Sequence, residues 1–156
     1  MEAAISRERH YNKDTGHRRL GIDVARYGDD RTVFALRDGA NVEKVRVEAK
    51  LSTMEVAGII VSLIKQWTAH AVYIDVIGIG AGVYDRLVEM KKEADDYGRP
   101  KIAAHVQIVP VNVAEKAPAR PVLETEAQPC RLRDYLWLEM AYWLRRLRAV
   151  LCRFRP

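Results

Sequence analysis

The chain has 156 residues, of which 49% are apolar and 30% are charged, a balance typical of a globular domain with its own core. It has no apolar stretch near the ~18 residues that span a bilayer, and residues 1–14 lack the apolar segment of a secretory signal. Cys130 and Cys152 match no metal-binding or redox spacing. These features predict a cytoplasmic protein without a membrane partner, whose two thiols are structural or incidental.

The formal net charge of +5 comes from the C-terminal end, because residues 130–156 contain seven arginines against two acids and the rest of the chain is balanced. A basic segment of this kind contacts nucleic acid or an acidic partner, or else forms the solvated face of a terminal helix. On the first interpretation, Arg145, Arg146 and Arg148 are candidate DNA-binding residues.

Three strands are predicted after an N-terminal helix. Residues 2–11 have helical spacing, and the polar residues that follow break it. Residues 20–27 are typical of a buried strand, and residues 32–39 of a second strand that ends at an Asp-Gly turn signal. Apolar and polar side chains alternate over residues 41–51, which suits a half-exposed strand. Two successive hairpin connections indicate an antiparallel meander.

Helices then alternate with strands. Ser52-x-x-Glu55 is a capping box at the start of a predicted helix over 52–68. A short apolar strand over 70–76 is followed by a glycine-rich turn and a helix, for which Gly98 is the expected C-cap. Residues 102–113 are typical of a fifth strand, and residues 131–151 of a last helix.

This order predicts a ribonuclease H-like α/β fold: a three-strand antiparallel meander joined to parallel strands, with helices packed on the mixed sheet. We expect an N-terminal helix and linker over 1–18 and a ribonuclease H-like core over 19–113. A mobile proline-rich loop over 114–129 would precede a basic helix over 130–156 that packs on the core.

Two aspartates interrupt apolar strands, Asp23 in the middle of the first and Asp75 near the end of the fourth. A buried carboxylate without a partner is costly, and a shared divalent cation turns the repulsion between two carboxylates into coordination. Strands one and four are neighbours in the expected sheet, so the two acids should meet and suit Mg²⁺ or Mn²⁺ chemistry on a phosphodiester. The alternative is a strand-end Asp that accepts turn amides or pairs with arginine, and turn chemistry is favoured for Asp29 and Asp30.

The glycines of the GIGAG segment alternate and lack the full spacing of a dinucleotide-binding loop, and the sequence has no Walker lysine. A tight backbone beside Asp75 is therefore the favoured interpretation. The four histidines have no metal-ligand spacing.

Three segments, GIDVARYGDDRTVFALRDG, YIDVIGIGAGVYDRL and RDYLWLEMAYWLR, resemble the nuclease domain of the large terminase subunit of tailed bacteriophages. The match runs roughly from Leu20 to Leu147 and includes the Gly-x-Asp-x-Ala strand, the Gly-Asp-Asp turn and the Asp-x-x-Gly-x-Gly-x-Gly-Val block. The resemblance implies a metal-dependent endonuclease that cuts concatemeric viral DNA for packaging in the bacterial host cell. It places catalytic, metal-binding carboxylates at Asp23 and Asp75.

The resemblance also implies partners: double-stranded DNA, an ATPase motor domain, the small terminase subunit and the portal. No motor motif occurs in this chain. The third acid of the family follows the Trp-containing helix in a Ser-Pro-Asp-like segment that this sequence lacks, which predicts a truncated or degenerate copy. Asp30 and Asp134 are the candidate additional acids.

Three alternatives stay open on the sequence. One is a non-catalytic DNA-binding or assembly module that uses the arginine-rich last helix. Another is a different ribonuclease H-like nuclease, such as a junction resolvase. A nucleotide-binding domain of the actin and sugar-kinase type also opens with a Gly-x-Asp strand and a hairpin, but it needs a second half for which 156 residues leave no room.

Overall fold

The computed structural model describes residues 16–25, 30–39, 41–118 and 129–152, with side chains as far as residue 142 in the last helix. The helix expected over 2–11 and Asp29 lie outside the described residues. The chain divides into two units, Met1–Val111 and Asn112–Pro156, and each is described by itself.

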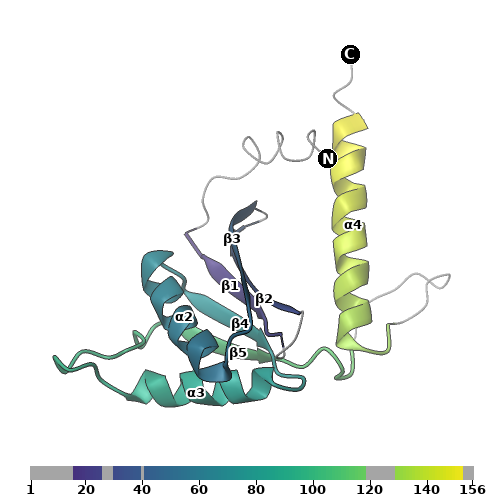
Figure 1. The fold of residues 1–156 in the computed structure, drawn as a ribbon. Coiled ribbons are helices and arrows are strands. Elements are labelled where there is room, and N and C mark those ends of the chain that lie inside the picture. The colour runs from purple at the N-terminus through teal and green to yellow at the C-terminus, as the bar shows by residue number, and fades with distance from the viewer. Residues whose placement is uncertain (1–15, 26–29, 40, 119–128, 153–156) are drawn as a thin grey trace. The chain divides into compact units, whose positions relative to one another are not determined.

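Five strands of the first unit form one mixed sheet in the order β3-β2-β1-β4-β5 (Figure 1). The first three pair antiparallel, and β1 pairs parallel with β4, as does β4 with β5. The predicted meander with parallel additions, and with it the ribonuclease H-like class, is confirmed. The strand bounds are β1 Arg19–Asp23, β2 Arg31–Asp38, β3 Asn41–Ala49, β4 Ala71–Asp75 and β5 Gln107–Val111.

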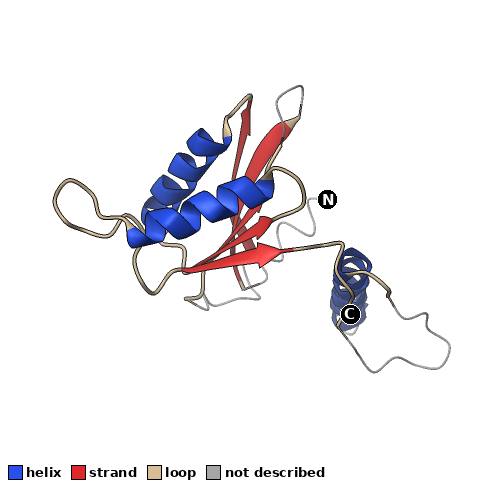
Figure 2. Cartoon of the chain, turned by 90° about the horizontal axis from the view of Figure 1, so that it is seen from below, coloured by secondary structure: helices blue, strands red, loops and turns tan. Residues whose placement is uncertain are grey.

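Two helices, α2 (Thr53–Gln66) and α3 (Gly80–Lys92), lie on the same face of the sheet (Figure 2). The predicted capping box starts α2: the Ser52 hydroxyl accepts from the Glu55 amide at 3.2 Å, and the Glu55 carboxylate accepts from the Ser52 amide at 2.8 Å. Between helices and sheet lies one apolar core, to which the strands contribute Leu20, Ile22, Phe34, Leu36, Val72 and Ile74.

Successive side chains of a strand point to opposite faces, so the residues between these core positions point away from α2 and α3. We call this side of the sheet the open face, because no described helix of the first unit packs on it. The valines of β3 on this face are 46 to 58% exposed. The half-exposed strand expected over residues 41–51 is confirmed as β3, and its apolar side chains lie on the open face rather than on the core side.

The helix α3 ends six residues before the glycine that was expected to cap it. Its C-cap is Glu93, whose amide donates to the Met90 carbonyl. Gly98 does have a left-handed φ of 74°, but it closes a separate turn in which its amide donates to the Asp95 carbonyl at 2.9 Å. The expected C-cap is wrong because a bridge between Ala94 and Pro100 takes the chain out of the helix first.

The second unit contains α4 (Leu132–Cys152). The start of α4 is held by a bridge between Lys116 and Arg131 and by the Arg133 amide, which donates to the Val113 carbonyl at 3.1 Å. The middle of the proline-rich loop, residues 119–128, lies outside the described residues. Within the described part of the chain, no helix is both long and apolar enough to cross a membrane.

Candidate active site

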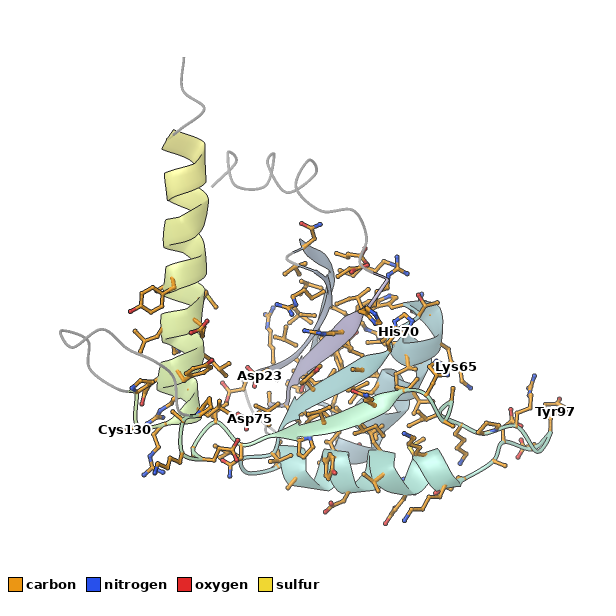
Figure 3. All side chains as sticks on the ribbon, turned by 180° about the vertical axis from the view of Figure 1, so that it is seen from behind. Asp23, Lys65, His70, Asp75, Tyr97 and Cys130 are labelled. Carbon is orange, nitrogen blue, oxygen red and sulfur yellow. The ribbon has the colours of Figure 1, made fainter. Side chains whose placement is uncertain are left out.

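Asp23 and Asp75 are the last residues of two neighbouring parallel strands, β1 and β4. The preceding residues, Ile22 and Ile74, are register partners and belong to the core, so both aspartates point to the open face. Neighbouring strands lie about 4.8 Å apart, which brings the two carboxylates to one place. Figure 3 shows the two labelled aspartates close together at the ends of their strands.

Neither aspartate is buried: Asp23 is exposed and Asp75 is half-buried. Asp75 lies at the end of its strand as expected, but the expectation that both carboxylates are buried, with Asp23 in the middle of its strand, is wrong for two reasons. The strand β1 ends at Asp23 rather than continuing beyond it, and alternation turns both side chains away from the core. The acids therefore need no partner to offset burial, and they are accessible from the open face.

The two carboxylates differ in how they are held. One oxygen of Asp75, Oδ1, accepts a hydrogen bond from the Ile77 amide at 3.0 Å, which ties the side chain to the turn after β4. The Asp23 carboxylate makes no hydrogen bond or ion pair with another described residue. Three of the four oxygens are thus available to a ligand, and the position of the Asp75 side chain is fixed by its own turn.

That turn is the glycine-rich segment, and Gly80 is its tightest point. A Cβ added to Gly80 would lie 1.8 Å from the Asp75 carbonyl oxygen. By contrast, a Cβ at Gly82 would meet nothing within 4 Å. The start of α3 therefore packs directly on the backbone of Asp75. This agrees with the tight backbone beside Asp75 that the glycine-rich segment predicted. Sequence reasoning did not single out Gly80, because alternating glycines give no sign of which one is sterically required.

The other candidate acids do not form a larger cluster with Asp23 and Asp75. Among the described residues, no group of three or more His, Cys, Asp or Glu side chains could hold a metal ion. Asp30 is exposed and directly precedes β2, at the same end of the β1–β2 hairpin as Asp23. Asp134 lies in the second unit, where its carboxylate accepts from the Arg131 amide at 3.3 Å and caps the start of α4.

The candidate DNA-binding residues Arg145, Arg146 and Arg148 lie on α4, but their side chains are outside the described part of the structure.

No protein-family model and no curated protein sequence matches the chain. Solved structures of the nuclease domain of the large terminase subunit gp2 of bacterial virus Sf6 do match. One, with manganese and β-thujaplicinol, has 19% identity and a TM-score of 0.57. Two others, one of them with calcium, have 18% identity and TM-scores of 0.56.

Each match covers 73% of this chain and 45% of the Sf6 chain, so this chain spans less than half the length of the structures it matches. At this identity, the likeness establishes the fold: the chain has the ribonuclease H-like architecture of these nuclease domains.

Proposed function

We propose that this chain is the nuclease domain of a phage DNA-packaging terminase, and that it hydrolyses phosphodiester bonds in viral DNA with the help of a divalent cation. The observation that carries the proposal is the placement of Asp23 and Asp75 at the ends of adjacent parallel strands, directly after the register partners Ile22 and Ile74, on an accessible face. The fold shared with the Sf6 nuclease domain supports it.

The two aspartates fit Mg²⁺ or Mn²⁺. These ions take oxygen ligands, and Mg²⁺ in particular is bound through one or two carboxylates together with water and substrate phosphate oxygens. Such an ion would activate a water and stabilise the charge on the reacting phosphate. Manganese and calcium in the Sf6 structures are consistent with this ligand class.

Each residue has a distinct part in this proposal. Asp75 holds one carboxylate oxygen toward the site while its other oxygen is fixed by the Ile77 amide. Asp23 offers a carboxylate that no described residue restrains, so it can adjust to the ligand. The exposed Asp30 is the described acid best placed to add a further ligand, because it lies at the same end of the β1–β2 hairpin.

The wider setting belongs to the same proposal. A packaging nuclease cuts concatemeric DNA in the cytoplasm of the bacterial host, and it works with a motor domain, a small terminase subunit and the portal. The chain spans 45% of the matched structures, so these partners and the activity of the whole protein are part of what is proposed.

The test is nicking of supercoiled plasmid in Mn²⁺ by the wild type, Asp23→Asn, Asp75→Asn and the control Asp96→Asn. Asp96 is exposed and adjoins Tyr97, which Figure 3 shows at the opposite end of the first unit from the aspartates. Because metal stabilisation of transition-state charge contributes several kcal/mol, we expect each site variant to lose about a hundredfold or more in rate. The control should cut like the wild type.

A wild type that cuts nothing would contradict the proposal, as would site variants that cut as fast as the control. If DNA binding then survived Asp23→Asn but was lost when Arg145, Arg146 and Arg148 were neutralised, the chain would be a non-catalytic DNA-binding module instead.

A further inference from the structure

Two arginines face each other across the first hairpin. Arg19 of β1 and Arg37 of β2 are register partners, and both are exposed. They alternate with the core residues Leu20 and Leu36, so both point to the open face. Side chains at directly opposite positions have Cβ atoms about 4.5–5.5 Å apart, which places two positive charges side by side.

This pair is unfavourable for the folded protein by itself, because like charges directly opposite each other destabilise a sheet. Neither arginine forms an ion pair or a side-chain hydrogen bond with another described residue. Other arginines nearby are neutralised: Arg18 lies 3.3 Å from Glu43, and Arg46 lies 2.9 Å from Glu48. Arg19 and Arg37 thus form a concentrated positive charge without a counter-ion among the described residues.

The positions next to the pair on the open face carry no charge, and Arg31, the other arginine of β2 on this face, lies at the opposite end of the strand. In the same row across the sheet, the register neighbours of the pair are Val42 and Ala71. The next row toward the aspartates contains Ala35, Gly21 and Tyr73. Gly21 and Ala35 have the smallest side chains of that row, so no large side chain lies between the arginines and the aspartates along β1.

Spacing connects the pair to the candidate active site. Arg19 and Asp23 are the two ends of β1, four residues apart on the same face, which corresponds to about 13 Å. A bound duplex carries a phosphate about every 3.4 Å of helix axis on each strand, so DNA that lies on the aspartates also presents phosphates at about this distance from them.

We propose that Arg19 and Arg37 bind phosphates of duplex DNA about 13 Å from the bond that is cut, on the open face of the sheet. This inference rests on the proposed function, since it takes DNA as the substrate. Charge complementarity favours DNA over a protein occupant: the pair offers two guanidinium groups, which suit phosphate oxygens, and no described carboxylate competes for them.

The experiment measures binding of a short fluorescent duplex, in EDTA so that nothing is cut, at salt concentrations between about 50 and 200 mM. The variant is Arg19→Gln/Arg37→Gln. Its control is Lys65→Gln/Lys92→Gln, which removes the same two charges from exposed positions on α2 and α3. Melting temperatures of all proteins are measured alongside.

We expect the arginine variant to bind DNA roughly eightfold more weakly per arginine at 0.1 M salt. The slope of its log binding constant against log salt concentration should be smaller in magnitude by about two. Its melting temperature should hold or rise because the repulsion is relieved, whereas arginines needed only for folding would lower it. The control should keep the wild-type slope.

Equal affinity and slope for the arginine variant and the control would overturn the inference. Such a result would point instead to a protein surface covering this face, with the exposed β3 valines as contacts. Plasmid nicking by the wild type in Mn²⁺ separates the outcomes: nicking with an unchanged slope refutes only the arginine site, and no nicking refutes the proposed function.

Discussion

Gly80→Ala is expected to disturb the candidate active site through the backbone of Asp75. The added Cβ would lie 1.8 Å from the Asp75 carbonyl oxygen, where contacts under 3.0 Å essentially do not occur, so the gap must open by at least 3.0 − 1.8 = 1.2 Å. The obstructing atoms include the Asp75 carbonyl carbon as well as its oxygen. No rotamer change can relieve a clash with backbone, so either α3 or the end of β4 has to move.

The size of the effect follows from this displacement. A misplacement of about 1 Å in a catalytic constellation can cost about a hundredfold in rate. Overpacking costs about 1–3 kcal/mol of stability, partly offset by the gain of up to ~1 kcal/mol when Gly becomes Ala in a helix. We therefore expect a modest fall in melting temperature but a large loss of Mn²⁺ affinity and nicking rate.

Gly82→Ala is the matched control, because Gly82 lies two residues further along α3 and its Cβ would meet nothing within 4 Å. Mn²⁺ affinity by calorimetry and nicking rate are compared well below the melting temperature of each variant, so that both report on folded protein. If Gly80→Ala binds Mn²⁺ and cuts like Gly82→Ala, then Gly80 does not position Asp75 and the steric argument fails.

Two further predictions concern stability. Ser52→Ala removes the N-cap of α2 and should lower the free energy of unfolding by about 1 kcal/mol in urea, whereas Ser52→Asp should retain most of it; equal losses in both would contradict the capping geometry. Glu93 is held by Lys101 and Arg86, and these hydrogen bonds keep its pKa below the ordinary 4.5. Its contribution is therefore present above pH 4.5 and lost as the pH falls through the lower folded pKa. Glu93→Gln should flatten the dependence of melting temperature on pH in that acidic range, and an unchanged profile would show that the contacts are not retained in solution.

The adjacency of the two aspartates could be predicted from the order of the elements. Once Asp23 is placed in the first strand and Asp75 in the fourth, the meander-plus-parallel topology makes their strands neighbours, and this holds in the structure. The capping box of Ser52 and Glu55 was equally predictable, because both hydrogen bonds form within three residues of sequence.

The burial of side chains, and the face of the sheet on which they lie, were harder to predict. Asp23 follows an apolar run, but whether its side chain is buried depends on which face α2 and α3 cover, and no local pattern specifies that. For the same reason the alternation of β3 predicted a half-exposed strand but not that its valines lie on the open face.

Residues that act through long-range geometry left no usable signal in the sequence. The role of Gly80 depends on a contact with Asp75 that only the packing of α3 creates. Arg19 and Arg37 lie opposite each other because of the register of the β1–β2 hairpin. The sequence did not show where β1 ends, so it could not predict this register.

The central claim, that Asp23 and Asp75 together hold a divalent cation, is tested most directly by Mn²⁺ affinity in a double-mutant cycle. Calorimetric titration is made on the wild type, Asp23→Asn, Asp75→Asn and the double variant. If the two carboxylates share one ion, each single variant weakens binding and the double variant loses clearly less than the two losses added together. Equal Mn²⁺ binding by the wild type and the double variant would contradict the claim.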